Sequence, residues 1–485
     1  MVKKTGNTLF IFSKVLLIIS ITLSLIPFIF LSFFTYPNAE DFSLSIIPQY
    51  TSPLFSVVEY YLNYDARLFT NLLYAINPLV YKSLWAYKFL PLIMITGLFI
   101  SVFLLVKEVL TKINKKAYTL LTTALIFCLF SGQMPSPVHA FYWMASGLNY
   151  TVSLCLLLLL LSLIIRIVKK IYQKQKPSIS SLLLCVILVY CIVLSNEIYI
   201  FSLLLIFGST YVLALFKKRP ERNLYLLLFI VASLASFIYF IPSIVMSDTV
   251  SRNYEQNIFM ASVIYATKQT FYNVLKWIFL NPSLLILTSI FIVSAPHIPE
   301  IPDASKRAFI PLYFFIPLIC IFLIILLSPY YMFRGFEHEP QRIFNMQYMF
   351  FLLSWFYSFY YVIVKKMKSQ KVYSILSRPP IILTLVVAFA LSVCAMKNVS
   401  MAYHDLISGK AMDYASQMSE RIKSCEIAQK NIDKAALVKI IENKPLTISF
   451  PPDLLEGQEE SIWFDAYRKY FNLRVIKLEE RSTDD

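Results

Sequence analysis

The chain has 485 residues, of which 58% are hydrophobic and only 15% are charged, and its formal net charge is +16. A soluble globular chain carries about 25% charged residues. This composition excludes a soluble enzyme, a nucleic-acid-binding protein and a secreted disulfide scaffold. The seven cysteines show no C-x-x-C pair and no regular spacing, so they indicate neither a metal site nor a disulfide framework.

Eleven long apolar runs predict an all-α polytopic membrane protein with about 11 transmembrane helices. A helix crosses a bilayer core with about 20 apolar residues, and several such runs in one chain are typical of a helical membrane bundle. The strands of a transmembrane β-barrel would alternate instead. The predicted spans cover about 11–34, 88–106, 117–134, 148–166, 178–195, 198–216, 223–245, 277–295, 308–328, 343–364 and 380–397.

Residues 179–216 are too many for one span. As a single helix they would extend about 57 Å, whereas the bilayer core is about 30 Å thick. Ser195-Asn196-Glu197 is therefore expected to form a tight outer turn between two spans.

The basic residues predict the orientation. With the N-terminus in the cytoplasm, the inner segments carry 23 Lys and Arg residues and the outer loops carry 8. Cytoplasmic loops hold the basic excess, so we expect a cytoplasmic N-terminus and an extracytoplasmic C-terminal segment. The first run is longer than the apolar region of a signal peptide and no A-x-A site follows it, which indicates an uncleaved anchor.

Residues 398–485 are predicted to form a small extracytoplasmic α/β domain after a transmembrane domain of residues 1–397. Residues 446–450 and 474–478 are predicted as short strands, with a helix at about 461–471 between them. A stripe at spacings of three and four predicts an amphipathic helix. Its members are Ile407, Ala411, Tyr414, Met418, Ile422 and Cys425.

The long first outer loop, residues 35–87, opens with two adjacent carboxylates, Glu40 and Asp41. On a helix they diverge by about 100°, so we expect one to face a cavity and the other to cap a helix. Partial burial raises a carboxyl pKa and suits a general base, and Asp41 is our candidate for that role. The alternative is that Asp41 is the N-cap of a helix, for which Asp is a preferred residue.

Further along this loop, Asp65 and Arg67 stand two residues apart among aromatic residues. Arg67 suits bidentate binding of a phosphate. The alternative is an internal ion pair with Asp65 or a contact with lipid headgroups.

The second outer loop is uncharged at neutral pH and contains His139, Trp143 and Asn149. Trp143 is either a residue of the aromatic belt at the membrane surface or a stacking platform for a sugar. His139 is either a structural residue or a substrate ligand.

Ionisable residues at two other outer turns complete the candidate site. Glu197 lies between two apolar spans, where an ionisable group indicates function, although a polar cap at the headgroup level is the alternative. The fifth outer loop carries Arg334, His338 and Arg342. Adjacent residues in a loop rarely converge on one ion, so this loop indicates phosphate binding by its arginines rather than a metal site.

Taken together, the outer-loop motifs resemble the GT-C superfamily of polyprenyl-phosphate-sugar glycosyltransferases. More narrowly, they resemble an uncharacterised bacterial multi-pass membrane family linked to surface polysaccharide synthesis. The matching pieces are Ala39-Glu40-Asp41-Phe42, Asp65-Ala66-Arg67, Ala145-Ser146-Gly147-Leu148-Asn149-Tyr150, Ser195-Asn196-Glu197, Glu339-Pro340-Gln341-Arg342, Ser461-Ile462-Trp463-Phe464-Asp465 and Tyr470-Phe471-Asn472-Leu473. Relatives tend to have two Asp at Glu40-Asp41 and Gly-Arg at Ala66-Arg67, which leaves the choice of base between Glu40 and Asp41 open.

The resemblance implies transfer of a sugar from a polyprenyl-phosphate carrier to a glycan or lipid acceptor, as in O-antigen modification, outside the bacterial cytoplasmic (inner) membrane. Asp41 or Glu40 would be the base, and Arg67, Arg334 and Arg342 would neutralise the leaving phosphate. No metal and no cofactor are expected. Two other classes stay open: a transporter or flippase of lipid-linked sugars, which predicts ionisable residues in mid-span, and a non-catalytic scaffold for polysaccharide assembly.

Overall fold

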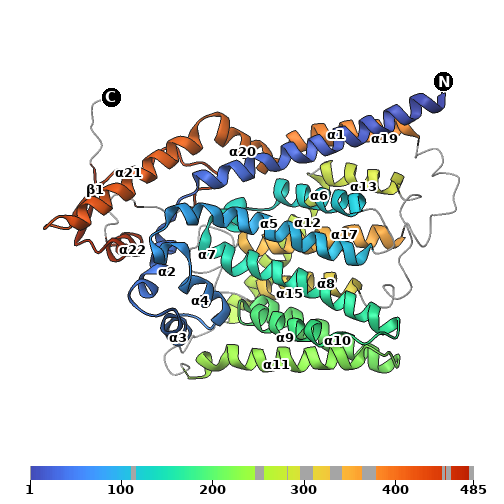
Figure 1. Ribbon diagram of the computed structural model, residues 1–485, viewed down its shortest axis with the longest axis horizontal. Coiled ribbons are helices and arrows are strands. Elements are labelled where there is room, and N and C mark those ends of the chain that lie inside the picture. The colour runs from blue at the N-terminus through green and yellow to red at the C-terminus, as the bar shows by residue number, and fades with distance from the viewer. Residues whose placement is uncertain are drawn as a thin grey trace. The chain divides into compact units, whose positions relative to one another are not determined.

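The computed structural model describes residues 2–110, 116–245, 256–280, 282–294, 310–327, 341–362, 378–450, 454 and 460–479. Helices dominate this part of the chain (Figure 1). The first half contains α1 (Val2–Leu31), η1 (Ser32–Phe34), α2 (Ala39–Tyr50), α3 (Pro53–Asn63), α4 (Leu68–Ala75), η2 (Pro78–Tyr81), α5 (Leu84–Val109), α6 (Lys116–Gln133), η3 (Val138–Tyr142), α7 (Met144–Ser146), η4 (Gly147–Thr151), α8 (Val152–Tyr172), α9 (Ile179–Val193), α10 (Glu197–Phe216) and α11 (Arg222–Val245). The second half contains α12 (Gln256–Phe279), α13 (Pro282–Ser294), α15 (Ile310–Leu327), α17 (Gln341–Val362), α19 (Pro379–Cys394), α20 (Lys397–Ile407), α21 (Lys410–Lys430), β1 (Ala435–Val438), α22 (Ile462–Phe471) and β2 (Val475–Leu478).

The long apolar helices make this an all-α membrane protein. Among the described residues, five helices are long and apolar enough to cross a bilayer, and two bent helix pairs raise that number to seven if each pair is one span. The five are Leu9–Phe34, Leu84–Val109, Met144–Tyr172, Glu197–Phe216 and Arg222–Pro242. Where the structure describes the predicted apolar runs they are mostly helical, but the number of eleven spans stays a prediction.

Two helix breaks have clear local causes. The predicted turn after residue 194 is confirmed, since α9 ends at Val193 and α10 begins at Glu197, with the Asn196 side chain accepting a hydrogen bond from the Ile198 N–H. The predicted span at 277–295 is instead a helix pair bent by 60°, whose second helix begins at Pro282. Proline lacks an N–H and tolerates only the first turn of a helix.

The chain divides into two compact units. The first comprises Met1–Leu25, Gly97–Pro135 and Ser153–Val399, and the second comprises Ile26–Thr96, Ser136–Val152 and Ser400–Asp485. The predicted domain boundary at 397/398 lies close to the change of unit after Val399, but the second unit also takes in all of the first predicted outer loop.

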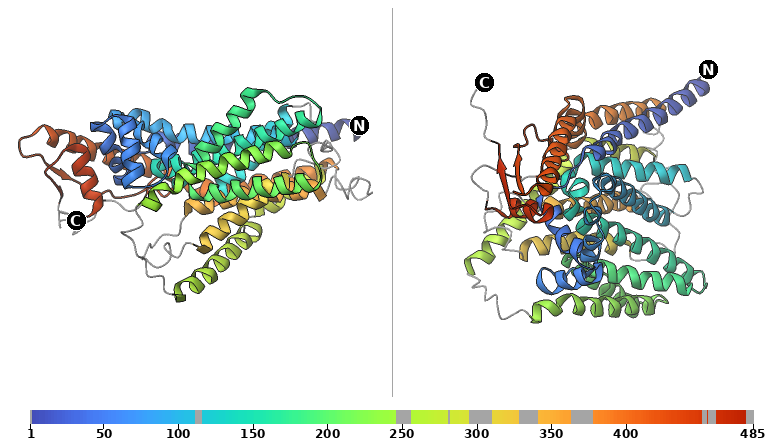
Figure 2. Two further views of the ribbon diagram at one scale, coloured as in Figure 1. Left: turned by 90° about the horizontal axis from the view of Figure 1, so that it is seen from below. Right: turned by 60° about the vertical axis from the view of Figure 1, so that its left-hand side comes forward.

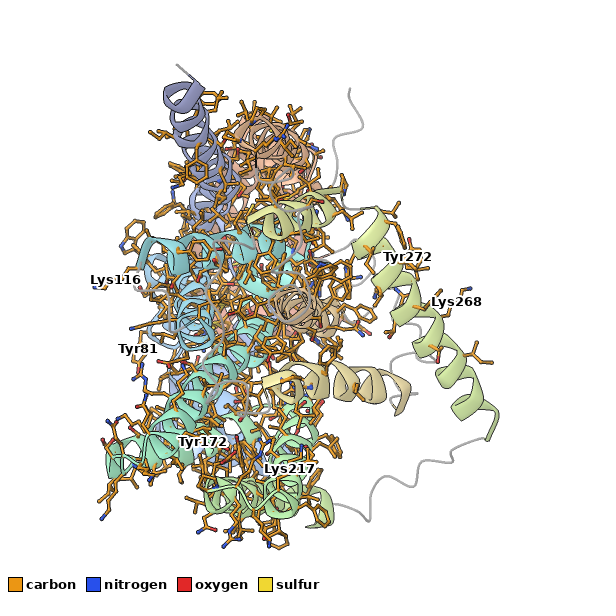
Figure 3. All side chains as sticks on the ribbon, turned by 90° about the vertical axis from the view of Figure 1, so that its right-hand side faces the viewer. Tyr81, Lys116, Tyr172, Lys217, Lys268 and Tyr272 are labelled. Carbon is orange, nitrogen blue, oxygen red and sulfur yellow. The ribbon has the colours of Figure 1, made fainter. Side chains whose placement is uncertain are left out.

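The first unit is a bundle of apolar helices. Helix α10 packs against α9, α11 and α15, and α15 packs against α12 and α17, as the neighbouring ribbons in Figures 1 and 2 show. Helix α12 leaves one side exposed with Lys268 and Tyr272, whereas Asn273 and Trp277 are buried (Figure 3). Such a one-sided burial is typical of a helix at the edge of a bundle.

A charge cluster joins α5 and α8 within this unit. The buried Glu108 carboxylate accepts hydrogen bonds from Arg166 Nε and Lys169 Nζ, each at 3.0 Å. Lys169 Nζ also donates to the Glu108 carbonyl. A second buried carboxylate, Glu221, accepts a hydrogen bond at 2.9 Å from Tyr172 at the end of α8 (Figure 3). Pairing of this kind is what makes a buried charge tolerable.

The second unit contains the described strands of the protein. Strands β1 and β2 pair in parallel, with Ala435 opposite Val475, and α22 lies in the connection between them (Figure 2). A parallel pair needs such a crossover. The predicted helix at 461–471 and strand at 474–478 are confirmed as α22 and β2.

The predicted strand at 446–450 is wrong. Residues 446–448 form a turn in which the Thr447 N–H donates a 2.9 Å hydrogen bond to the Asp405 carboxylate, so this backbone group has no strand partner. The partner of β2 is the earlier segment Ala435–Val438.

The predicted apolar stripe is confirmed except at its first member. Five of its residues are buried on α21: Ala411, Tyr414, Met418, Ile422 and Cys425. Ile407 is 82% exposed because it ends α20, and Gly409, whose φ of 78° suits a residue without a Cβ, separates the two helices.

Candidate functional site

The second unit brings together seven of the candidate residues, and its centre is the start of α2. Asn38 caps this helix: its side chain accepts a hydrogen bond from the Asp41 N–H, and the Asp41 carboxylate accepts one from the Asn38 N–H. This is a capping box. Asp41 is therefore not the N-cap itself: Asn38 is the N-cap of α2, and Asp41 takes part in the capping as the third residue of the helix.

Asp41 also joins α2 to two distant segments. Its Oδ2 accepts a 2.7 Å hydrogen bond from the Tyr87 hydroxyl, and its Oδ1 accepts a 3.0 Å hydrogen bond from the Ala145 N–H. The carboxylate is fully buried. Burial is the largest influence on it and, against the lowering effect of these donors, raises its pKa from 3.8 to about 7.

Ala145 is held through both of its backbone polar groups. Its N–H donates to Asp41, and its carbonyl accepts a 2.8 Å hydrogen bond from the Tyr74 hydroxyl of α4. Helix α7 is thereby tied to both α2 and α4. Asp41 and the stretch Ala145–Tyr150 belong to two separate sequence motifs, and in the structure they are joined by this hydrogen bond.

Glu40 has a different environment from its neighbour. It is half-buried, and its charge acts on Tyr74 together with those of Asp65 and Arg67. Burial first, and then the charges of Asp65 and Glu40, raise the pKa of Tyr74, and Arg67 opposes them. The charges of Glu40, Asp65 and Arg67 therefore all act on the same hydroxyl group.

Asp65 and Arg67 form the internal ion pair that the sequence left as an alternative. The nearest charged atoms, Arg67 Nη1 and Asp65 Oδ2, are 3.8 Å apart, and the Arg67 N–H donates a 3.0 Å hydrogen bond to Asp65 Oδ1. Both side chains keep about a fifth of their surface exposed (22% and 23%). The cluster of Glu40, Asp65 and Arg67 thus keeps some access to solvent.

One buried polar atom lies beside this turn. Asn71 of α4 donates a 3.2 Å hydrogen bond from Nδ2 to the Asp65 carbonyl, while its Oδ1 is buried without a hydrogen-bond partner. An unsatisfied buried acceptor costs free energy, so a water molecule or a ligand hydroxyl at this position would be stabilised.

The aromatic candidates of the second outer loop are covered. Trp143 is only 4% exposed, and the Phe450 ring is stacked on it with centroids 3.8 Å apart. The predicted sugar-stacking face is therefore occupied by a side chain of the protein itself. His139 contacts both rings and bonds through Nδ1 to the Ser136 hydroxyl at 2.8 Å, and Asn149 is buried in η4. Structural roles account for the placement of His139 and Trp143.

The remaining candidates belong elsewhere. Glu197 and Arg342 lie in the first unit, where the Tyr239 hydroxyl donates a 2.9 Å hydrogen bond to Glu197. Arg334 and His338 lie outside the described residues. Within the described ranges, no three His, Cys, Asp or Glu side chains are grouped so that they could hold a metal ion.

Sequence reasoning missed three residues of this assembly, Tyr74, Tyr87 and Phe450. Aromatic residues near the membrane surface are ordinary, so nothing local distinguished these from the others. The sequence offered one general signal: a buried acid at the start of a helix requires hydrogen-bond donors from other segments. It did not indicate which residues supply them.

The fold defines a helical membrane protein, and the part of the second unit that follows the first long apolar helix in the chain carries a partly exposed carboxylate and guanidinium pair. No family model, curated protein or solved structure matches the chain. The resemblance drawn from the short motifs therefore stays an expectation, and the chemistry of the site has to carry any proposal.

Proposed function

We propose that the chain is a membrane glycosyltransferase that moves a sugar from a polyprenyl-phosphate carrier to a glycan or lipid acceptor. The observation that carries the proposal is the cluster of Glu40, Asp65 and Arg67, which combines a half-buried carboxylate with a partly exposed guanidinium. Transfer from a phosphate carrier needs both a base and a positive charge at the leaving group.

Glu40 is the base in this proposal. A general base must reach the hydroxyl from which it takes a proton, and Glu40 keeps exposed surface whereas Asp41 is fully buried. Asp41 is then a positioning residue, because its hydrogen bonds to Tyr87 and Ala145 hold the first turn of α2 in place.

The chemical step balances with these groups. Glu40 accepts the proton of the acceptor hydroxyl, whose oxygen forms a bond to the anomeric carbon of the donor sugar. The bond from that carbon to the phosphate oxygen breaks, and the electron pair leaves with the polyprenyl phosphate. Arg67 stabilises the charge that grows on this phosphate, and it exchanges part of its 3.8 Å contact with Asp65 for the phosphate oxygens.

Orientation is part of the proposal. The excess of basic residues in the inner segments puts the N-terminus in the cytoplasm and this unit on the outer side of a bacterial cytoplasmic membrane. A reporter enzyme that works only outside the cytoplasm should be active when fused after residue 485. If instead only a reporter that works in the cytoplasm is active there, the proposed orientation is wrong.

The decisive experiment compares three carboxamide variants. Full-length protein in lipid nanodiscs is supplied with undecaprenyl-phosphate-linked glucose, galactose or N-acetylglucosamine and with envelope glycans as acceptors, and release of undecaprenyl phosphate is measured. Glu40→Gln should lower the rate by about 10²–10⁴-fold, the usual contribution of a general base. Glu59→Gln on α3 is the matched control and should leave the rate unchanged.

Asp41→Asn separates the two candidate bases. A rate loss confined to Asp41→Asn, with Glu40→Gln fully active, would return the role of base to Asp41. If the wild-type protein releases undecaprenyl phosphate and both variants match it, the glycosyltransferase mechanism is wrong, and the scaffold or transporter class is preferred.

A further inference from the structure

A groove lies between α2 and the end of α22, away from Glu40 and Asp41 in the first turn of α2. Its volume is about 500 Å³, which lies within the range of about 300–1,000 Å³ for small-molecule sites. Both sides of the groove belong to the second unit.

Local structure gathers the cations of this groove. Arg468 and Lys469 occupy the last turn of α22, where positive charge is favoured by the helix dipole. Asn472 adopts the left-handed conformation that ends the helix, and Arg474 directly precedes β2. The Arg474 N–H donates a 2.8 Å hydrogen bond to the Lys434 carbonyl, which fixes this backbone position.

The opposite side of the groove is apolar and aromatic. Ile46 and Tyr50 are four residues apart on α2 and share one face of that helix. Tyr50 is 66% exposed. Three aromatic residues of α22 hold the two helices together through Phe42, with ring centroids 4.5–5.5 Å apart, so both sides of the groove rest on a packed core.

The lining also supplies a hydrogen-bond acceptor. Asp465 pairs with Lys469 at 2.7 Å and more loosely with Arg468 at 3.5 Å. Among the residues that the structure describes, Arg474 has no ion-pair partner, so a net positive charge remains for an anion.

We propose that this groove binds an anionic carbohydrate, a glycan that carries carboxylate or phosphate groups. The guanidinium of Arg474 recognises the anionic group. The electron-rich face of Tyr50 contacts the C–H groups of a sugar ring. Asp465 accepts hydrogen bonds from sugar hydroxyls, which the phosphate groups of a lipid surface do not offer. The proposal does not require that the protein transfer a sugar.

The test measures binding to the full-length protein in nanodiscs of phosphatidylcholine. Trigalacturonate is the anionic probe, and maltotriose, of the same length, is the neutral one. Trigalacturonate should bind, maltotriose should bind at least about tenfold more weakly, and Arg474→Gln should weaken trigalacturonate binding by about tenfold or more, the loss expected from one charge-assisted hydrogen bond. Tyr50→Ala should weaken binding of trigalacturonate, and trigalacturonate should still bind more tightly than maltotriose.

Lys477→Gln is the matched control, because Lys477 is an exposed cation of β2, three residues after Arg474 and outside the groove. Equal losses in Arg474→Gln and Lys477→Gln would overturn the proposal, since they would show a general effect of charge. Inorganic phosphate that displaces trigalacturonate at equal concentration would overturn it in favour of a simple anion site. Binding only to vesicles that contain phosphatidylglycerol would overturn it in favour of a membrane contact.

Discussion

Glu108 in α5 and Asp41 in α2 are both buried carboxylates, but their partners differ. Glu108 faces two cations at 3.0 Å, whereas Asp41 faces a phenol and two backbone N–H groups. Cations offset a buried negative charge directly. Neutral donors offset only part of the desolvation, which is why the pKa of Asp41 rises to about 7.

The stability of the two sites therefore depends on different quantities. Glu108 depends on its cations, because removing one member leaves a buried charge without compensation. Asp41 depends on proton concentration, because its carboxyl group titrates close to neutral pH. Variants at the two sites should therefore respond differently to pH.

The largest effect is expected for Glu108→Ala. It leaves Lys169, whose side chain is only 11% exposed, without its carboxylate. Breaking a buried pair in this way costs about 3–5 kcal/mol, measured as the free energy of unfolding of the full-length protein in detergent. Lys107→Ala, an exposed neighbour on the same helix, is the control. A loss of unfolding free energy no larger than that of the control would contradict the claim that Glu108 and its cations compensate each other's buried charges.

The next effect is the pH dependence of stability through Asp41. The folded pKa is about 7 and the ordinary value is 3.8, so the folded state holds a proton that the unfolded state releases. The contribution of Asp41 to stability should be full below about pH 4, fall by about 1.4 kcal/mol per pH unit as pH rises, and level off above about pH 7. Asp41→Asn should remove this slope, and Asp65→Asn should keep it. An unchanged slope in Asp41→Asn would show that another group titrates.

Tyr87→Phe should have a smaller effect. It removes the hydroxyl group that donates to Asp41 at 2.7 Å, and a hydrogen bond of this kind contributes about 1–2 kcal/mol. This donor lowers the pKa of Asp41, so the pH at which stability levels off should move upward. Tyr81→Phe, at an exposed tyrosine, is the control. A pH profile that coincides with that of wild type would contradict the assignment of Tyr87 as a donor to a charged carboxylate.

Arg166→Gln should have the smallest effect. The Arg166 side chain is 46% exposed, and Lys169 still compensates Glu108 when Arg166 is lost. Exposed ion pairs contribute less than about 1 kcal/mol. A loss as large as that of Glu108→Ala would mean that the cluster acts as one unit and that Lys169 alone does not suffice.

Local patterns were sufficient for most of the helices and for some of the candidate site. Apolar runs located the long helices, Ser195-Asn196-Glu197 located the break between α9 and α10, and the spacing of Ala411, Tyr414 and Met418 located the buried face of α21. The internal pair of Asp65 and Arg67 was among the predicted alternatives because the two residues are close in sequence.

Contacts between distant segments could not be predicted in this way. Tyr87 lies 46 residues from Asp41 and Ala145 lies 104 residues from it, and no local period encodes such a pairing. The strand at 446–450 was predicted from its alternating pattern, but pairing decides which segment becomes a strand, and Ala435–Val438 has the partner. The sequence leaves Trp143 open between an aromatic-belt residue and a stacking platform, because Phe450, which covers it, is far along the chain.

The contact between Phe42 and α22 has a consequence for the order of synthesis. Phe42 is made early, but the aromatic rings that bury it belong to residues 467–471. Tyr467 lies 425 residues after Phe42 (467 − 42), so at about 5–20 residues per second the ribosome needs roughly 20–85 seconds to reach it. During that interval the first turns of α2 present an uncovered aromatic surface, and a chain that stops before α22 keeps it exposed. Quality-control proteases and chaperones that recognise exposed apolar surface would therefore distinguish a truncated chain from a finished one at Phe42.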